Sequence, residues 1–298
     1  MTDTLRVQAA RRYGTRSPLR YPGGKSALAG VLADVIEHLD IAPPVYVEPY
    51  AGGAGAGVAL LQEGLVRRLV INDFDPAVHA FWQAAVKDNR RFVEWVSSVP
   101  LTLQEWHRQR DVYRCGAKDE FQLGCAFFFL NRTNRSGVLN AGVIGGQRQA
   151  GRYRIDARFN RETLIERLAA IGQMADCIEV SDLDGRSIIR RYGSKRSVFM
   201  YIDPPYVLAG SQLYLNAFDA HDHEALAEAV ARITSARWLM TYDVSDMVKR
   251  LYSKYFQCLL DLNYSARYPG VAQELLIAPE DVAQALCALP TMPVATGA

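Results

Sequence analysis

Cysteine is scarce in this sequence, and the five that occur (Cys115, Cys125, Cys177, Cys258 and Cys287) show no paired spacing. Because no C-x-x-C motif is present, neither a disulfide framework nor a structural zinc site is indicated, and a reduced, cytoplasmic protein is expected. Long apolar runs are missing too, since no stretch approaches the roughly 20 residues of a membrane span. No apolar segment follows the first arginines, so we expect neither a signal peptide nor a membrane partner.

Several common catalytic patterns are also absent. There is no G-x-S-x-G elbow and no cysteine–histidine arrangement that would indicate covalent catalysis. Gly24-Lys25-Ser26 resembles the end of a P-loop, but Leu19 stands where that motif requires glycine, so triphosphate binding is not predicted. His221 and His223 flank Asp222 without a third ligand at metal spacing. We interpret them as the start of a helix with Asp222 near its N-terminus, and we predict no metal site.

The composition is that of a globular protein. Of the 298 residues, 49% are hydrophobic and 22% are charged, which is enough for a large core and, by length, for about two domains. The 34 basic and 32 acidic side chains leave a formal charge of only +2. At first sight, this small charge argues against a nucleic-acid partner.

The order of the apolar segments predicts an α/β fold. A strand-like run at 45–47 leads into a glycine-rich loop, a helical segment follows at 58–61, and a second strand is expected at 68–73. Strand, glycine loop, helix and strand form a βαβ unit, which implies a parallel sheet covered by helices. Further strands are expected at 178–180, 198–202, 238–241 and 274–277, with a helix over 223–232.

The middle of the chain, about residues 81–171, follows a different pattern. Segments around 92–96 and 121–130 are expected to be helical, whereas 131–160 is rich in glycine, arginine and asparagine and has hairpin-like turns at 140–142 and 145–146. We therefore predict an α/β domain formed by residues 1–80 and 172–298. The smaller domain inserted at 81–171 is predicted to be mainly helical and to contain a hairpin.

Asp203-Pro204-Pro205-Tyr206 directly follows the apolar strand predicted at 198–202. Ligands of open α/β sheets bind beyond the carboxyl ends of the strands, where this tetrapeptide would lie. Two successive prolines exclude helix, so the carbonyls of Asp203 and Pro204 are expected to point into the site. A carboxylate and a carbonyl that accept both amine hydrogens, with a phenol stacked on the ring, suit a planar base with an exocyclic amine. We favour this interpretation over a simple turn with an aspartate cap.

A second site is predicted in the loop from Glu48 to Gly55, with Asp73 at the end of the next strand. Glycines let the backbone approach a ligand closely, and an acidic residue about 20 positions further on binds ribose hydroxyls in Rossmann-type sites. The dinucleotide pattern G-x-G-x-x-G does not fit, because Val58 stands where the third glycine is needed. The loop therefore suits a ribose-bearing cofactor without a pyrophosphate, and the glycine-rich segment 19–26 suits the carboxylate of an amino-acid-like ligand.

Arginine is concentrated in two regions of the chain. Residues 132–167 hold eight arginines against three acidic residues, a net charge of +5, and residues 1–20 hold five arginines against one aspartate, a net charge of +4. The rest of the chain then has a net charge of −7, so the small total charge of +2 is the sum of basic and acidic regions. Arginine and asparagine contact base edges and arginine contacts phosphates, so the insert is predicted to face a nucleic acid.

Together these motifs resemble the Dam-like, D12 class of N6-adenine-specific DNA methyltransferases, over residues 20–277 and in the order of that family. The segment 21–25 is similar to the family's aromatic-x-Gly-Gly-Lys motif, 48–55 to its S-adenosylmethionine loop, and 71–73 to its ribose-binding strand end. Ser181-Asp182-Leu183 resembles the acidic motif near the cofactor adenine. The segment 203–206 resembles the catalytic motif, and 274–277 the last strand.

The resemblance implies a Rossmann-like methyltransferase sheet with an inserted target-recognition domain. It implies methyl transfer from S-adenosylmethionine, which leaves S-adenosylhomocysteine, to N6 of an adenine flipped out of double-stranded DNA, without a metal. The implied catalytic residues are Asp203, Pro204, Pro205 and Tyr206. The implied cofactor-binding residues are Tyr21, Gly23, Gly24, Lys25, Glu48, Pro49, Tyr50, Ala51, Gly52, Gly53, Asp73, Asp182 and Asp203. The predicted DNA-binding residues are Arg132, Asn134, Arg135, Ser136, Asn140, Arg148, Arg152 and Arg154.

Some alternatives stay open at this point. N4 of cytosine presents a similar amine, and a degenerate methylase fold can serve as a DNA-binding regulator, although Lys25, Asp73, Asp203 and Tyr206 are all present. Relatives specific for GATC tend to carry an aromatic-Asn-Gly step and an arginine where this chain has Arg135-Ser136-Gly137 and Asn140, so the recognition sequence is open. Open too are a bacterial or phage origin with nucleoid association, solitary action or a cognate restriction nuclease as partner, and a monomeric or weakly dimeric state.

Overall fold

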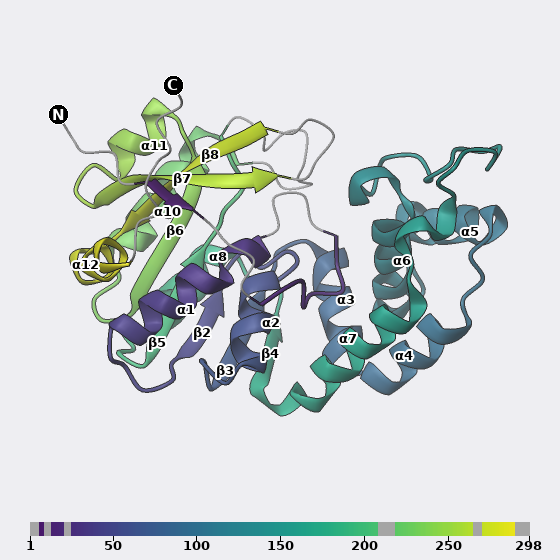
Figure 1. Cartoon of the computed structure of the whole chain (residues 1–298), viewed down its shortest axis with the longest axis horizontal. Helices are drawn as coiled ribbons and strands as arrows, with labels where there is room; N and C mark the ends of the chain where they lie inside the picture. Colours follow the sequence, from purple (N-terminus) through teal and green to yellow (C-terminus); the bar gives the residue numbers. More distant parts are fainter. Residues whose placement is uncertain (1–5, 9–12, 21–24, 208–217, 265–269, 290–298) are drawn as a thin grey trace, which may run out of the picture.

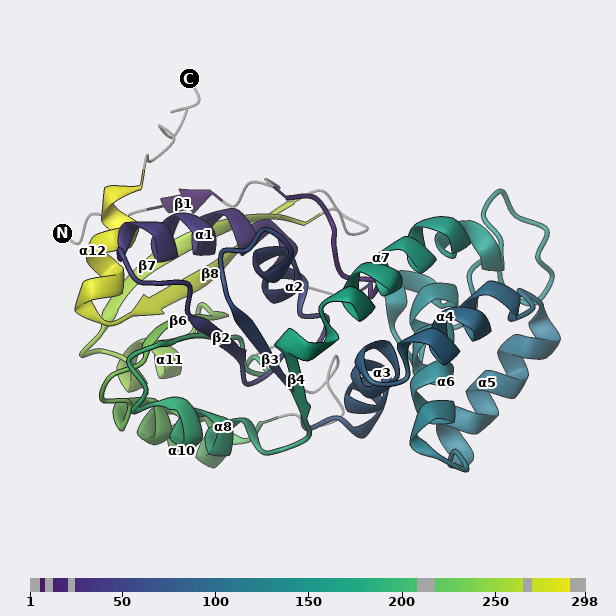
Figure 2. The same cartoon turned by 90° about the horizontal axis from the view of Figure 1, so that it is seen from below.

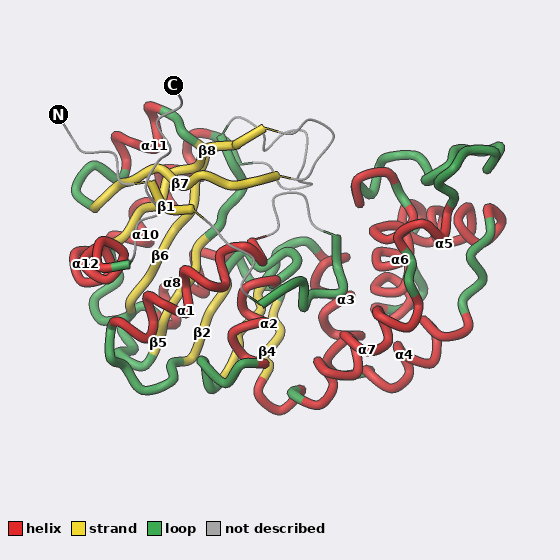
Figure 3. The backbone as a smooth tube through the Cα atoms, in the orientation of Figure 1, coloured by secondary structure: helices red, strands yellow, loops and turns green. Residues whose placement is uncertain are grey.

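The computed structural model describes residues 6–8, 13–20, 25–207, 218–264 and 270–289. At one end of the molecule a β-sheet lies between helices, and at the other end a group of helices and loops stands beside it (Figures 1 and 3). The predicted α/β fold with a mainly helical insert is confirmed. No helix within the described ranges combines the length and the apolar character needed to span a bilayer.

The sheet holds eight strands within the described part, in the order β1-β7-β8-β6-β5-β2-β3-β4. Only β8 runs antiparallel to its neighbours, β6 and β7. The bounds are β1 Arg6–Gln8, β2 Val45–Glu48, β3 Arg68–Asn72, β4 Ile178–Ser181, β5 Val198–Ile202, β6 Arg237–Asp243, β7 Phe256–Tyr264 and β8 Gly270–Ala278. All six predicted strands are present, while β1 and β7 were missed.

Helices cover both faces of the sheet, as Figure 2 shows from below. One layer contains η1 (Lys25–Leu28), α1 (Ala29–His38), α2 (Gly55–Gln62) and α12 (Glu280–Ala288), whose apolar side chains join one buried core. The opposite layer contains α8 (Gly185–Tyr192), α10 (Ala220–Ala231) and α11 (Asp246–Leu251), which enclose a second core. Because helices bury both faces of the sheet, the central strands consist of nearly continuous apolar residues.

The helix expected at 223–232 begins slightly earlier, at Ala220. Its N-cap is Asp219, whose carboxylate accepts from the backbone N–H of Asp222, while the Asp222 side chain accepts from the N–H of Asp219. This reciprocal pair satisfies N–H groups that the first turn leaves without helical partners. Asp222 therefore lies in the first turn, as predicted, and His223 is buried against Tyr242.

The insert occupies the connection between β3 and β4, which are neighbours in the sheet. Its elements are α3 (Pro76–Val86), α4 (Asn89–Ser98), α5 (Leu103–Cys115), α6 (Glu120–Thr133), η2 (Arg135–Gly137), η3 (Ile155–Arg158), α7 (Arg161–Gln173) and η4 (Ala175–Cys177). Where a hairpin was expected, the described residues form one isolated antiparallel bridge, between Asn134 and Val143. Glycines and arginines around it offer few side chains that pack across a longer ladder. The domain boundaries at 80/81 and 171/172 stay a prediction.

A cluster of buried aromatic rings joins the helices of the insert. Phe128 of α6 stacks on Phe81 of α3 with ring centroids 5.7 Å apart and meets Phe92 of α4 edge to face at 5.3 Å. All three side chains have no exposed surface, and they belong to the same apolar core as α1 and α2. The insert and the sheet therefore share one hydrophobic core.

The strand order reverses its direction beside β2, which makes this place a topological switch point. The chain passes from β2 to β3 on one side and, after β4 at the edge of the sheet, returns to β5 on the other side of β2. Loops that leave neighbouring strands in opposite directions open a site between them, at the carboxyl ends of the strands. Here those loops are the glycine-rich loop after Glu48 and the loop that begins at Asp203.

We expect Phe128→Ala to lower the free energy of unfolding by about 3–5 kcal/mol, because it leaves a cavity among packed rings. Since the core is shared, sheet and insert should unfold in one transition, which urea denaturation followed by tryptophan fluorescence and far-UV circular dichroism would reveal. Tyr153→Ala, at a side chain that is 60% exposed, is the control and should change stability little. Two separate transitions would contradict a shared core.

Candidate functional site

The side chain of Lys25 is the centre of the site. It is only 8% exposed, yet its ammonium group lies 3.2 Å from Glu274 Oε1 and 3.3 Å from Asp203 Oδ2, and it donates to the hydroxyl of Tyr206 at 2.7 Å. Burial works against the charge, but the carboxylates of Asp203 and Glu274 outweigh it and raise the pKa of Lys25. One buried cation thus joins η1 to β8 and to the loop after β5.

Asp203 is oriented by hydroxyl groups as well. Its Oδ1 accepts from the Thr241 hydroxyl at 2.7 Å and from the Tyr206 hydroxyl at 3.0 Å. The Thr241 oxygen in turn lies 2.6 Å from the hydroxyl of Tyr201. Tyr201 and Thr241 lie on the adjacent strands β5 and β6 and are both buried. The rotamer of Asp203 is therefore fixed from the interior of the sheet.

The glycine-rich loop between β2 and α2 folds close to Asp73. The loop residues Gly52 and Ala54 both adopt left-handed backbone angles (φ +47° and +42°). The N–H of Gly52 donates to Asp73 Oδ2 at 2.8 Å, and the carbonyl of Gly52 accepts from the indole of Trp82 at 2.8 Å. A Cβ on Gly55 would lie 2.4 Å from the Ser26 hydroxyl, so glycine there lets η1 rest against the start of α2.

Asn72 ties three strand ends together and was missed as a site residue. Its Nδ2 donates to the carbonyls of Pro49 and Leu183, each at 2.8 Å, and its Oδ1 accepts from the Ser181 hydroxyl and from the N–H of Leu183. Asn72 is fully buried, so every polar atom of the amide is used. A polar residue at the end of an otherwise apolar strand was the signal in the sequence that could have identified it.

Burial also affects two carboxylates that were predicted as cofactor ligands. Asp73 accepts from the N–H groups of Gly52 and Asp75, yet burial raises its pKa to about 6. Glu48 lies at the end of β2 with its Oε1 2.9 Å from the N–H of Gly57, and burial raises its pKa to about 8. Glu48 is therefore mostly neutral near pH 7, whereas Asp73 is mostly ionised there.

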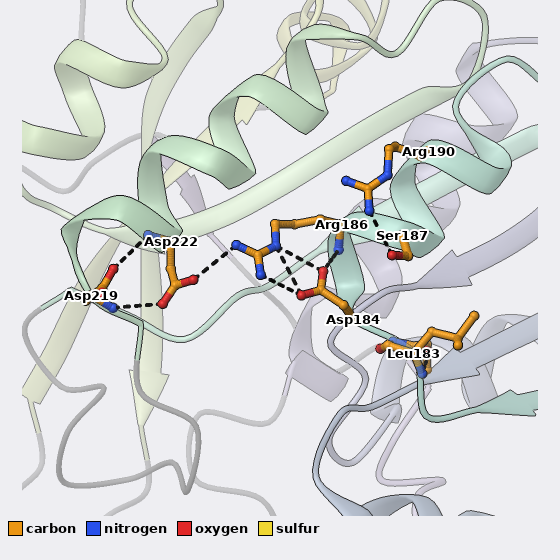
Figure 4. Close-up of polar contacts among 8 residues, drawn as sticks. Leu183, Asp184, Arg186, Ser187, Arg190, Asp219 and Asp222 are labelled. Atoms are coloured by element: carbon orange, nitrogen blue, oxygen red, sulfur yellow. Dashed lines mark hydrogen bonds and ion pairs between the residues drawn. The ribbon is translucent and has the colours of Figure 1, made fainter.

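An ion-pair network joins the loop after β4 to the first turns of α8 and α10. Figure 4 shows Arg186, in the first turn of α8, between Asp184, at 2.6 Å, and Asp222 of α10, at 3.0 Å. The Arg186 guanidinium holds the pKa of Asp184 below its usual range, although partial burial acts in the opposite direction. Tyr50 packs behind this network, since a Cβ on Gly185 would lie 2.3 Å from its ring.

The other predicted cofactor ligands divide into three groups. Pro49, Ala51 and Gly53 are buried in the loop after β2, which places them beside Gly52. Asp182 is exposed beyond β4, next to the exposed apolar side chain of Leu183. Tyr21, Gly23 and Gly24 lie outside the described residues.

Six of the eight predicted DNA-binding residues are exposed: Arg135, Ser136, Asn140, Arg148, Arg152 and Arg154. Asn134 is fully buried, where its Oδ1 accepts from the indole of Trp106 and its Nδ2 donates to the carbonyls of Val138 and Leu139. Its amide holds the loop together, so we no longer propose Asn134 as a contact to DNA. Arg132 is only partly exposed and donates to the carbonyl of Pro18.

Comparison with known proteins identifies the family. The profile of the D12 class N6 adenine-specific DNA methyltransferases matches residues 21–263. This chain belongs to that family. The curated type II methyltransferase M.MjaIII of Methanocaldococcus jannaschii is 25% identical over 205 residues, which cover 63% of this chain and 68% of the relative.

Among solved structures, the rRNA methyltransferase AviRa of Streptomyces viridochromogenes aligns with a TM-score of 0.35 and 16% identity, over 87% of this chain and 86% of that one. The family match confirms the predicted membership. In the described part of this D12 family member, no group of three or more histidine, cysteine or acidic side chains is arranged to hold a metal ion.

We expect Glu48→Gln to change how stability depends on pH. The native pKa of about 8 lies above the ordinary value of 4.5, so the native state holds a proton that the unfolded state releases. The contribution of Glu48 to stability should therefore fall as the pH rises from about 4.5 to about 8, and the glutamine variant should lose this part of the pH dependence. Urea unfolding at pH 5, 6.5 and 8 measures it, with Glu37→Gln, at an exposed site on α1, as control. An unchanged slope in Glu48→Gln would refute the buried neutral carboxyl.

Proposed function

We propose that the protein transfers a methyl group from S-adenosylmethionine to N6 of an adenine in DNA. The observation that carries the proposal is the position of Asp203, held by Lys25, Thr241 and Tyr206 at the end of β5. The loop after β5 begins beside the glycine-rich loop after β2, because the two strands are neighbours. Methyl donor and methyl acceptor would therefore meet between these loops.

The residues around Asp73 fit the methyl donor. The carboxylate of Asp73 keeps lone pairs that can accept ribose hydroxyls, and its raised pKa of about 6 still leaves it ionised at neutral pH. Phe74 and Leu183, which follow Asp73 and Asp182, are 57% and 42% exposed, and such apolar side chains suit the faces of an adenine ring. The Tyr50 hydroxyl is buried without a partner among the described residues, which marks a polar position that a ligand can satisfy.

The chemistry follows from how Asp203 holds the amine. The bound donor supplies an electrophilic methyl group on a sulfonium. The lone pair of adenine N6 is delocalised into the ring, so the amine is a weak nucleophile until its hydrogens are bound by acceptors. Asp203 and the Pro204 carbonyl would accept these hydrogens and stabilise the positive charge that grows on N6 as the new C–N bond forms. The S–CH3 electron pair would stay on sulfur as the methyl group moves to N6, and N6 would then release one proton to Asp203 or to water.

Tyr206 and Lys25 would have to rearrange when the base enters. In the described structure the Tyr206 hydroxyl donates a hydrogen bond to Asp203 Oδ1, and the Lys25 ammonium forms an ion pair with Oδ2. Turning Tyr206 frees Oδ1 for the amine and presents the phenol ring for stacking. N6 is inaccessible in a base-paired duplex, so we propose that the adenine is flipped out into this site.

We expect Asp203→Ala to reduce methyl transfer at least 100-fold while binding of S-adenosylmethionine is kept in part, because the acceptor for N6–H is lost. Transfer of labelled methyl groups to DNA measures the first quantity, and isothermal titration calorimetry measures the second. Asp246→Asn, at an exposed position on α11, is the control. Unchanged turnover in Asp203→Ala would refute the mechanism.

The product distinguishes the proposed substrate from its alternative. Methylated DNA is digested to nucleosides and separated by mass. N6-methyladenine is the expected product, whereas N4-methylcytosine would move the proposal to cytosine and the absence of both would indicate a binding protein.

We also expect Thr241→Val to lower kcat about tenfold with little change in KM for S-adenosylmethionine, because Asp203 loses the hydroxyl that orients it. Thr241→Ser keeps the hydroxyl and should restore most of the rate. If serine and valine variants are equally slow, the effect comes from packing and Thr241 is not a positioning residue.

A further inference from the structure

Four arginines gather where the N-terminal segment meets the insert. Arg20 precedes η1, Arg132 lies in the last turn of α6, Arg158 ends η3 and Arg167 lies on α7. We call Arg20, Arg132, Arg158 and Arg167 the arginine cluster. Only Arg132 was predicted as a site residue from the sequence, although Arg158 and Arg167 belong to the arginine-rich region 132–167 and Arg20 to the basic N-terminal region.

Backbone carbonyls hold three of these side chains in place. Arg167 donates to the carbonyl of Ser17 at 3.1 Å, Arg132 to that of Pro18 at 3.4 Å, and Arg20 to that of Asn134 at 3.1 Å. A guanidinium carries five N–H groups, so these single bonds leave most donors of each arginine available. The Nε of Arg132 is buried and has no hydrogen-bond partner among the described residues.

Within the described residues, the charges that act on this cluster are mostly those of other arginines. The charged groups that act on Arg132 are Arg20, Arg158 and Arg167, and burial together with these like charges lowers its pKa to about 9. Burial and Arg158 likewise lower the pKa of Arg20. The exposed Glu166 acts on Arg167, and Arg16 nearby is already paired with Glu63. Such a cluster is costly when empty and is stabilised by an anion.

The position of the cluster points to DNA as the source of that anion. The backbone N–H of Arg20 donates to Asn131 Oδ1, and the Asn131 amide donates back to the carbonyl of Arg20, so the N-terminal segment is attached to the loop that carries Arg135 and Ser136. In the other direction, Arg20 lies five residues before Lys25. Five residues reach at most about 18 Å, the length of about five base-pair steps.

We propose that the arginine cluster binds a backbone phosphate of the DNA, a few nucleotides from the methylated adenine. The proposal rests on the proposed function for the identity of the nucleic acid. Guanidinium groups match the oxygens of phosphate, so several arginines at one site would bind a phosphate through directed hydrogen bonds as well as through charge. The phosphate neutralises the repulsion and fastens the N-terminal segment, and with it Lys25, to the insert.

Binding of a short duplex made only of G·C pairs tests the proposal without methyl donor and without adenine. Arg158→Gln is the main variant, because Arg158 is exposed, and Arg90→Gln on α4, which removes the same charge from an arginine that is 94% exposed, is the control. We expect Arg158→Gln to weaken binding about tenfold and to reduce the slope of log K against log salt by about 1, whereas Arg90→Gln changes both little. Equal weakening in the two variants would overturn the proposal.

Thermal unfolding separates a binding cluster from a structural one. We expect Arg158→Gln without DNA to be at least as stable as the natural protein, because one repelling charge is gone, and inorganic phosphate to raise the Tm of the natural protein more than that of the variant. A lower Tm with unchanged DNA binding would show that the cluster only supports the fold. A phosphate response without any change in duplex binding would overturn DNA as the source of the phosphate.

These results do not depend on methyl transfer. If the G·C duplex binds as expected but no methylated base is formed, the phosphate site stands and the proposed function fails. If transfer occurs and the two variants bind DNA alike, the proposed function stands and the phosphate site fails.

Discussion

The ion pairs of Lys25 are the interaction on which the site depends. A buried ammonium group is stable only when carboxylates compensate for the water it has lost, and here Asp203, directly after β5, and Glu274 of β8 do so. The same lysine reaches Tyr206 and is carried by η1, which rests on Gly55 at the start of α2. The lysine thus holds η1, α2, the loop after β5 and β8 together. Loss of the lysine would leave the carboxylates of Asp203 and Glu274 close to each other in a poorly solvated place.

Much of the sheet could be predicted from the sequence, because two-sided burial produces apolar runs that are easy to see. β5 and β3 are examples, with polar residues directly after them. β7 was missed although Phe256, Cys258 and Leu260 alternate with other residues, because one face of this strand is less buried. β1 has only three residues and pairs with β7 across most of the chain length, so no local pattern could reveal it.

The site was predictable as motifs but not as contacts. Asp203, Asp73 and Lys25 carry chemistry in recognisable strings, whereas Thr241, Tyr201 and Glu274 act through tertiary proximity alone. Asn134 illustrates the opposite error: residue type and an arginine-rich neighbourhood suggested base contacts, yet its amide is consumed by Trp106 and by its own loop. Composition predicts which surface is basic, but the hydrogen-bond partners decide which polar side chains remain available.

The insert leaves the sheet at the end of β3 and returns at β4, its immediate neighbour. Everything from α3 to α7 is therefore one enlarged crossover, and strand order does not depend on its length or content. This arrangement permits recombination between relatives, because the segment between β3 and β4 can be replaced by that of a relative without a change in strand order. The packed rings of Phe81, Phe92 and Phe128 limit where the exchange can begin and end, since a chimaera has to exchange them together or keep them together. On the proposed function, with recognition of the DNA sequence by the insert, exchange of whole inserts would change sequence preference and leave the methyl-transfer residues of the sheet intact.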